Sequence, residues 1–406
     1  MAKPKIRFKG YTEDWEQRKF ADFTWNAGKR NKEDLDLEPY AITNERGFIR
    51  QCDAHDDFGY MKDTDRKAYN IVKSNSFAYN PARINVGSIG YYKGSENVIV
   101  SSLYEVFQTD NYVNDRFLWH WFKSDEFPRW IEKLQEGSVR LYFYYDKLCE
   151  CQLYMSSVEE QEKIASFLDN LDCLITLHQR KCEETKKLKK YMLQKMFPEE
   201  GKSVPKIRFA EFTNPWEQRK LGELGSLKNG MNFSKDAMGI GFPFVNLQNI
   251  FGNNVIDVTN LGKATASDSQ LKDYNLLNGD VLFVRSSVKL EGVGEAALVP
   301  QNLENTTYSG FIIRFRDEYG LDNNFKRFIF GIEAVRNQIM AQATNSANKN
   351  ISQTVLENLC LKIPSKSEQE KIGLYFSNLD TLITLHQRKS DELQKIKKFM
   401  LQNMFV

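Results

Sequence analysis

Residues 160–197 read EQEKIASFLDNLDCLITLHQRKCEETKKLKKYMLQKMF, and residues 368–405 read EQEKIGLYFSNLDTLITLHQRKSDELQKIKKFMLQNMF. The two stretches align without a gap at an offset of 208 residues (160 to 368), and 25 of the 38 positions are identical. An internal repeat of this length indicates that the whole architecture is duplicated.

Both copies have the spacing of a coiled-coil seam, with steps that alternate between four and three residues. Phe167, Leu174, Tyr375 and Leu382 widen this stripe near the start of each copy, which suits packing against a domain as well. At 1.5 Å per residue each helix would be about 55 Å long. We therefore predict an antiparallel helix pair rather than two ordinary core helices. Its seam residues are Ile164, Leu168, Leu171, Ile175 and His178 in the first copy, and Ile372, Phe376, Leu379, Ile383 and His386 in the second.

Length and composition narrow the class of protein. A chain of 406 residues has room for two or three domains, and 13% aromatic residues are typical of a globular chain. The net charge is only +2, so a face that binds nucleic acid would have to be local. The six cysteines lack zinc-type spacing and predict free thiols. Without a membrane-length apolar run, the sequence predicts a cytoplasmic location.

A second repeat precedes each helix at some distance. Residues 4–20 read PKIRFKGYTEDWEQRKF and residues 205–221 read PKIRFAEFTNPWEQRKL, at an offset of 201 (4 to 205). Each segment is either a strap that docks through Trp15 or Trp216 or simply the strand and turn that start a domain. The predicted boundaries are 1–157 for the first domain, 158–197 for its helix, 198–204 for a linker, 205–365 for the second domain and 366–406 for the C-terminal helix.

The regions between the repeats diverge over a shared pattern. The stretch SSLYEVFQ (101–108) pairs with SGFIIRFR (309–316) as a predicted strand, and residues 77–92 pair loosely with 281–299, where Arg83 and Arg285 follow apolar runs. Helical patterns follow at 115–134 and 322–341. The pattern predicts two similar α+β domains related by a pseudo-two-fold repeat.

These features together resemble the specificity subunit of type I restriction-modification systems. The resemblance covers nearly the whole chain, and it is carried by LYMSSVEEQEKI (153–164), LKIPSKSEQEKI (361–372), GDVLFVRSS (279–287) and NISQTVLENLCLKIPS (350–365). Each motif is weak alone, but their order and duplication are specific. Ser156 stands where the second copy has Pro364, a small departure from the family's turn.

The resemblance implies a function without catalysis. Each domain, a target-recognition domain, would read one half of a bipartite, asymmetric site in double-stranded DNA. The paired helices would set the gap between the half-sites and bind two methyltransferase subunits, which restriction (translocase) subunits can join. AdoMet, ATP and Mg²⁺ would be bound by those partners and no metal by this chain, which would choose where an adenine is flipped and methylated.

DNA contacts are expected in polar, basic, turn-rich segments of each domain, at residues 73–83, 137–145, 285–292 and 343–350. Cations grip phosphates, whereas amides and aromatic rings reach base edges and faces. An exposed loop without such a role is the alternative for each residue. The candidates are Arg83, Arg140, Tyr142, Arg285, Lys289, Asn345, Asn348 and Lys349.

The sequence argues against three other functions and leaves a fourth as the alternative. An adenine methyltransferase would need an Asn/Asp-Pro-Pro-aromatic tetrad, and only NPAR (80–83) is present. GVGEAA (292–297) fits a dinucleotide fingerprint formally but is followed by ALVP rather than a helix. The carboxylates of the two EQEK motifs are interpreted as helix-start chemistry rather than a nuclease site. A duplicated protein-interaction scaffold without DNA reading stays as the alternative function.

Overall fold

The computed structural model describes residues 3–44, 47–54, 66–135, 142–344 and 349–406, apart from the side chain of Lys235. The chain divides into two compact units, Met1–Gln179 with Arg388–Val406, and Arg180–Gln387. Both division points fall inside long helices, at equivalent positions of the LITLHQRK repeat. Each unit therefore contains one α+β domain, the first half of the helix that follows it and the last half of the other helix.

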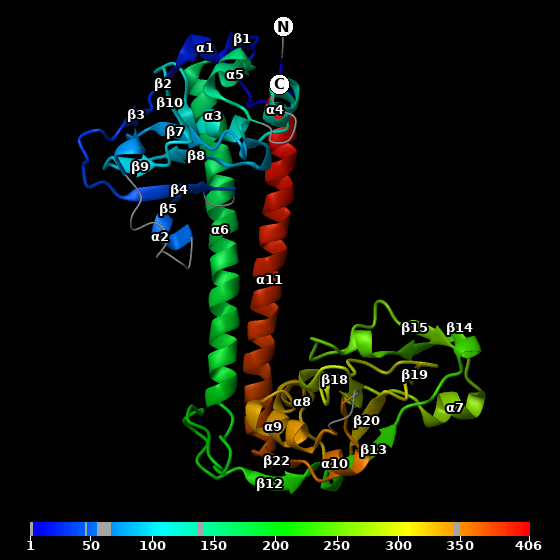
Figure 1. Cartoon of the computed structure of the whole chain (residues 1–406). Coiled ribbons are helices and arrows are strands. Elements are labelled where there is room, and N and C mark those ends of the chain that lie inside the picture. Colours follow the sequence, from blue (N-terminus) through cyan, green and yellow to red (C-terminus); the bar gives the residue numbers. More distant parts are fainter. Residues whose placement is uncertain (1–2, 45–46, 55–65, 136–141, 345–348) are drawn as a thin grey trace. The chain divides into compact units, whose positions relative to one another are not determined.

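The first unit is built on one four-stranded and one five-stranded sheet (Figure 1). A short pair joins β1 (Glu16–Lys19) to β11 (Gln152–Met155). The four-stranded sheet has the order β2 (Thr24–Asn26), β10 (Glu105–Thr109), β7 (Ser76–Tyr79), β8 (Ile89–Tyr92). The five-stranded sheet has the order β3 (Lys29–Arg30), β6 (Asn70–Val72), β9 (Val98–Val100), β4 (Pro39–Thr43), β5 (Gly47–Arg50). The helices are α1 (Phe20–Phe23), α2 (Gln51–Ala54), α3 (Asp115–Trp121), α4 (Glu126–Leu134), α5 (Tyr145–Glu150) and the first half of α6 (Val158–Lys195).

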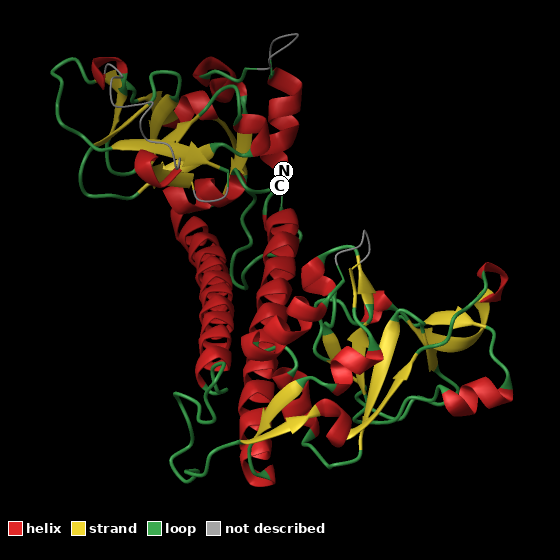
Figure 2. Cartoon of the chain, turned by 60° about the horizontal axis from the view of Figure 1, so that its bottom comes forward, coloured by secondary structure: helices red, strands yellow, loops and turns green. Residues whose placement is uncertain are grey.

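The second unit repeats the central sheet (Figure 2). Its short pair is β12 (Glu217–Lys220) with β22 (Cys360–Ile363), and its four-stranded sheet has the order β13 (Gly225–Asn229), β20 (Ile312–Asp317), β16 (Val281–Val284), β18 (Ala296–Leu298). A three-stranded sheet has the order β15 (Gly262–Ala264), β14 (Met238–Val245), β19 (Thr307–Tyr308), and β17 (Ser286–Ser287) pairs with β21 (Lys349–Asn350). The helices are α7 (Asp268–Asp273), α8 (Asn323–Ile329), α9 (Glu333–Gln342), α10 (Gln353–Glu357) and the first half of α11 (Lys366–Met404).

The predicted fold class is confirmed: both domains are α+β, with the same strand order in the central sheet, and long helices follow them. The helical patterns at 115–134 and 322–341 are helical in the structure, and each forms two helices. In the second domain Gly331, a poor helix former, lies in the break between α8 and α9. In the first domain the break lies just before Pro128, which fits only the first turn of α4.

In both units α6 and α11 pair side by side and run in opposite directions (Figure 1). In the second unit Cys182 of α6 lies against Ile383 of α11, and Lys189 of α6 contacts Asp380 of α11. The residue numbers of the contacts thus rise along α6 and fall along α11, as in an antiparallel pair. Most of the seam side chains predicted from the sequence are buried, and three are half-buried. Those buried are Ile164, Leu168, Leu171, Ile175, Ile372, Phe376 and Leu379, and those half-buried are His178, Ile383 and His386.

The C-terminal end of each long helix packs on the domain of the unit that contains that end. Leu393, Met404 and Phe405 of the C-terminal segment join the core formed by Trp15, Phe117 and their neighbours in the first unit. Met196 and Phe197 join the equivalent core around Trp216 in the second unit. Burial of these apolar ends, at roughly 25 cal/mol per Å² removed from water, ties both helices to both domains.

Candidate nucleic-acid interface

The two domains bring the same pair of segments together beside the central sheet. In the first, the Phe143 N–H donates to the Pro81 carbonyl oxygen at 3.1 Å. In the second, the Ile351 N–H donates to the Arg285 carbonyl oxygen at 2.9 Å. In each case the loop that leaves a central strand, β7 or β16, meets a segment that lies far along the chain. Two of the four segments expected to contact DNA thus lie together in each domain.

This pairing changes one expected correspondence. The sequence pattern placed Arg83 opposite Arg285, but the hydrogen bonds place Pro81 opposite Arg285. Arg83 lies two residues further along, exposed, at the start of a short 3-10 turn. The two arginines are therefore carried by different positions of the same loop.

In the first domain this region forms a polar cleft of about 870 Å³, which we call the asparagine cleft. The ring centroids of Tyr142 and Tyr144 lie 5.5 Å apart, with their planes at 4° to each other. Arg83 and Tyr142, two of the candidate residues, both line the cleft. Its full lining is Asn26, Gly28, Arg30, Asn70, Asn80, Pro81, Ala82, Arg83, Asn85, Ser102, Leu103, Tyr104, Glu105, Val106, Tyr142 and Tyr144.

The asparagine cleft contains both hydrogen-bond donors and hydrogen-bond acceptors. Asn80 is held by a local turn, in which its side-chain oxygen accepts the Ala82 N–H at 3.0 Å. The Arg30 guanidinium donates to the carbonyl oxygens of Ala68 and Ser102. Burial raises the pKa of Glu105, and Asp146 raises it further. Amides, guanidinium groups and flat aromatic rings are the groups that hydrogen-bond base edges and stack on bases.

In the second domain the equivalent region is more apolar. Lys349 pairs with Ser287 across β17 and β21, and Arg285 precedes this pair directly. Lys289 lines a cavity of about 500 Å³, which we call the apolar groove. Lys289 therefore lines the groove, whereas Arg285 and Lys349 lie on the adjoining segments and not in its lining. The lining of the groove is Leu247, Phe251, Ser286, Ser287, Val288, Lys289, Gly292, Glu295 and Phe311.

Some candidates fall outside the described residues, and some lining residues were not expected from the sequence. Arg140, Asn345 and Asn348 lie outside the described part of the chain. Asn26 and Arg30 come from β2 and β3, and Phe251 follows the short turn at 247–249, far from any candidate segment. A Gly-flanked basic stretch, NAGKR (26–30), was the available signal for the first two.

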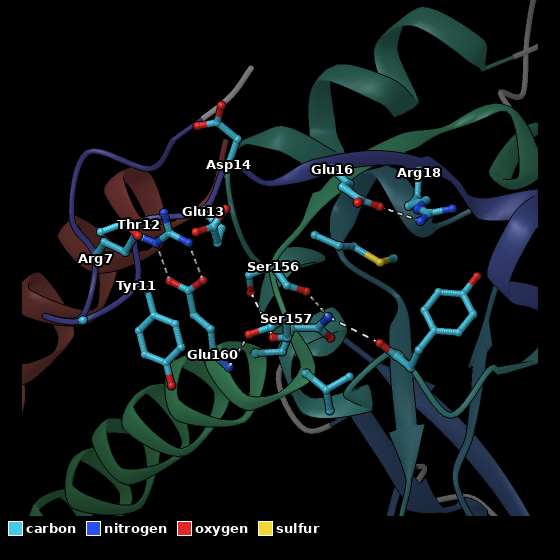
Figure 3. Close-up of a pocket in the computed structure, with 15 residues that line it drawn as sticks. Arg7, Tyr11, Thr12, Glu13, Asp14, Glu16, Arg18, Ser156, Ser157 and Glu160 are labelled. Atoms are coloured by element: carbon cyan, nitrogen blue, oxygen red, sulfur yellow. Dashed lines mark hydrogen bonds and ion pairs between the residues drawn. The ribbon is translucent and has the colours of Figure 1, made fainter.

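The EQEK motifs lie in a different kind of site, shown for the first copy in Figure 3. Both oxygens of the buried Glu160 carboxylate accept hydrogen bonds from Arg7, at 2.7 and 2.8 Å, and the Trp15 indole N–H donates at 3.2 Å. Arg208, Trp216 and Glu368 repeat this arrangement in the second unit. The acidic side chain in the first helical turn thus clamps the segment that starts each domain. Trp15 docks that segment, and the next four residues form β1, so both alternatives for it apply.

The glutamine next to each of these glutamates contacts the residue just before another helix, α3 in the first unit and α8 in the second. Gln161 accepts the Asn114 N–H at 2.8 Å, directly before α3, and Gln369 accepts the Asp322 N–H at 3.0 Å, directly before α8. Each EQ pair therefore connects its long helix to two parts of the same domain. These structural contacts of the glutamate and the glutamine account for the EQEK motif without a nuclease role.

Among the described residues, one group offers three potential metal ligands near each other: His120, Asp169 and Asp172. Arg116 already contacts the Asp169 carboxylate, and the Lys397 ammonium lies 2.5 Å from Asp172. The His120 Nε2 lies 2.9 Å from Asp169. Because both carboxylates are paired with cations, the group is best described as a polar contact between α3 and the two long helices.

No helix in the described part of the chain is long and apolar enough to cross a membrane. The long helices nevertheless expose apolar side chains. Leu174 and Leu382, which were expected to widen the packed stripe, are 42% and 43% exposed, whereas Phe167 and Tyr375 pack on the cores. Leu174 and Leu382 therefore do not pack on the two cores as expected.

The chain contains two copies of one α+β domain. Each copy carries one candidate recognition face and is followed by one of the two paired long helices. These features define a class of two-module proteins. The model of the family described as the type I restriction modification DNA specificity domain matches residues 12–187 and 213–395. The chain belongs to this family, the DNA specificity subunits of type I restriction-modification systems.

Curated relatives match this chain over 66% or more of its length. The type I restriction enzyme MjaVIII specificity subunit of Methanocaldococcus jannaschii is 23% identical over 95% of this chain and 91% of its own length. The EcoKI specificity subunit of Escherichia coli K12 is 24% identical over 66% of this chain and 59% of its own. The crystal structure of an S subunit from M. genitalium shares the fold with a TM-score of 0.58, at 14% identity, covering 100% and 99% of the two chains.

Proposed function

We propose that each domain of this chain reads one half of a bipartite, asymmetric DNA site and that the chain itself catalyses no reaction. The observation that carries the proposal is the equivalent position of the asparagine cleft and the apolar groove, which differ in chemistry on one scaffold. A protein that reads two different half-sites needs one frame with two unlike faces. AdoMet, ATP and Mg²⁺ are assigned to partner subunits.

The methylome of cells that carry the complete system tests the reading function. Adenine methylation at a bipartite motif is expected, and it should disappear when this chain is deleted. Exchange of residues 222–365 for the corresponding region of another family member should change only one half of the motif. Methylation that persists without this chain, or an exchange that alters both halves, would overturn the proposal.

We further assign the gap between half-sites to the helix pair. The 38 residues of α6 correspond to a length of roughly 57 Å. A seven-residue insertion after Lys181, with a matched insertion after Lys389, preserves the seam spacing and adds about 10 Å. The gap should lengthen by about three base pairs, since the duplex rises 3.4 Å per base pair. An insertion in one helix alone breaks the seam and is the control; an unchanged gap in the double insertion contradicts the assignment.

The proposal gives each unit one docking surface for a methyltransferase subunit. The first helix patch comprises Leu174, Leu177, Ile396 and Phe399, and the second helix patch comprises Leu382, Leu385, Leu188 and Tyr191. Every residue of the first patch corresponds to one of the second at the offset of 208 residues, and all eight are between 38% and 58% exposed. Large apolar side chains left exposed at matching positions of a repeat are candidates for a protein interaction site.

Substitution of one patch at a time tests the two-partner assignment. Leu177→Glu should remove one methyltransferase subunit from the complex, and Leu385→Glu should remove one as well, because each introduces a charge into an apolar contact. Thr176→Glu, at an exposed neighbouring position, is the matched control. Native mass spectrometry of the assembled complex counts the subunits. Full occupancy in both Leu variants would exclude the patches as docking surfaces.

A further inference from the structure

The apolar groove of the second domain has a surface that hydrogen bonding to bases does not explain. Val288 is 78% exposed, Phe311 58% and Phe251 38%, and all three line the groove. Isolated exposed apolar residues are ordinary, but a cluster of three around one groove indicates a binding site. The asparagine cleft, at the equivalent place in the first domain, is lined by four asparagines and two arginines, and Leu103, the counterpart of Phe311, is its one strongly exposed apolar side chain.

The apolar side chains are fixed in place by the backbone around them. The Phe311 carbonyl oxygen accepts the Arg285 N–H at 2.8 Å, and the Phe311 N–H donates to the Ser309 hydroxyl at 3.3 Å. A Cβ at Gly292 would lie 2.4 Å from the Ser287 Oγ and 3.1 Å from the Phe251 ring, so glycine allows this close approach. The groove is therefore a shaped surface and not a set of loosely placed side chains.

The charges around the groove suit duplex DNA. Lys289 lines the groove, and Arg285 and Lys349 lie on the two segments that adjoin it, so cations are available for the phosphates on either side of a base pair. The one carboxylate in the lining, Glu295, accepts the Gly252 N–H at 3.0 Å. Of the groups that a base pair shows in the major groove, the 5-methyl group of thymine is the apolar one.

We propose that the apolar groove recognises the 5-methyl group of thymine, so that the second domain distinguishes thymine from uracil in its half-site. Val288 and Phe311 would contact the methyl group, while the flanking cations hold the backbone. The inference rests on the proposed reading function and adds the chemical group that this face selects. The first domain, with its amide-lined cleft, would read its half-site by hydrogen bonds and stacking and would tolerate uracil.

The test uses the complex of this chain with its methyltransferase subunits and duplexes that carry the motif obtained from the methylome. Methylation of both strands guarantees an adenine, and therefore a thymine, in each half-site. Thymines are replaced by uracil in one half-site at a time, and affinity is measured by fluorescence anisotropy. Affinity should fall about fourfold for each contacted methyl group in the half read by the second domain, the factor for burying one methyl-sized group. In the other half it should stay within about 1.5-fold.

A variant pair connects the effect to the groove. Val288→Ser should abolish the difference between thymine and uracil duplexes, whereas Val86→Ser, at an exposed valine in the equivalent loop of the first domain, should preserve it. Equal losses in both half-sites, or no loss in the second domain's half, would overturn the proposal while leaving DNA reading intact. A Val288→Ser complex that loses a methyltransferase subunit would also overturn it, by showing that a protein occupies the groove. Absence of all sequence-specific binding would instead refute the reading function.

Discussion

The two modules of this chain are alike where they hold the helices and unlike where they face outward. The Arg7–Glu160–Trp15 clamp recurs as Arg208, Glu368 and Trp216, with ion-pair distances of 2.7 Å in both. The loops after β7 and β16 share a backbone contact but line an asparagine-rich cleft in one module and an apolar groove in the other. Buried ties restrict substitution strongly, whereas an exposed loop can change its chemistry at little cost in stability.

Smaller differences also occur inside the duplicated frame. Cys182 is buried in the seam of the second unit, and its counterpart in the first unit is Ser390. His120 and Asp169 of the first module are replaced by Phe328 and Ser377 in the second. Each difference is an internal experiment, because the surrounding scaffold stays the same. One module can therefore serve as the reference when a residue of the other is substituted.

The largest expected effect comes from the clamps. Glu160→Ala should destabilise the first unit by roughly 3–5 kcal/mol, because it leaves the Arg7 guanidinium without its buried partner. Glu368→Ala should destabilise the second unit by a similar amount, since its contacts match. Glu162→Ala, at an exposed position two residues further on, should change stability by less than about 0.5 kcal/mol. Urea unfolding followed by circular dichroism measures the losses, and a loss below about 1 kcal/mol at Glu160 would contradict the clamp.

The next effect concerns the seam. The Ser390 hydroxyl is buried and has no hydrogen-bond partner among the described residues, so Ser390→Cys should stabilise the first unit by about 1 kcal/mol. Cys182→Ser should be destabilising, because the Cys182 sulfur contacts carbonyl oxygens of Ile383 and Gln387 at 3.7 and 3.8 Å, too long for a hydroxyl. Thermal unfolding of both variants measures the change in stability, which should be a gain for Ser390→Cys and a loss for Cys182→Ser. Changes of the same sign would show that the difference between the modules at this position does not matter.

Much of this frame was predictable from the sequence. Steps of three and four residues placed Leu168 and Phe376 on the buried face, because a helix repeats its orientation on that period. The offset of 208 residues paired the helices and two central strands. The division of one helical pattern into α3 and α4 was not predictable, since amphipathic spacing continues across a short break.

The candidate sites were only partly predictable, for a topological reason. The segments that contain Arg83 and Tyr142 were chosen for composition, and the fold brings them together. Asn26 enters the cleft through the pairing of β2 with β10, in which it lies opposite Phe107, and Arg30 enters through the pairing of β3 with β6, in which it lies opposite Asn70. Such non-local pairing leaves no signal in the residues themselves. Phe311 was assigned to a strand, but β20 begins at Ile312, so its ring lies outside the sheet.

The cross-helix ion pairs should show a smaller difference between modules. Lys397 contacts Asp172 and Lys189 contacts Asp380, at 2.5 Å in both cases, and the two pairs are related by the repeat. Asp380 also accepts hydrogen bonds from Arg327 at 3.2 Å and Asn254 at 3.3 Å. Asp380→Asn should therefore cost about 1 kcal/mol and Asp172→Asn about half as much, as for partly exposed pairs. Urea unfolding at two salt concentrations checks the order, and a larger loss for Asp172→Asn would refute it.

The smallest effect is a pH dependence confined to the first module. Burial lowers the pKa of His120, and the Lys397 and Arg116 cations lower it further, against the opposing hydrogen bond with Asp169. The unfolded chain, with a histidine pKa near 6.5, then binds more protons than the folded chain below that pH. Stability of the first unit should be constant above about pH 7 and fall as the pH drops through 6.5. Phe328 occupies this position in the second module, which should show no such loss there.

Hydrogen exchange of peptides from 115–122 and 323–330 between pH 7 and 5, corrected for intrinsic rates, compares the two. His120→Gln retains a donor for Asp169 but does not titrate, so it should remove the difference; a slope that survives this substitution would assign the pH dependence to another group.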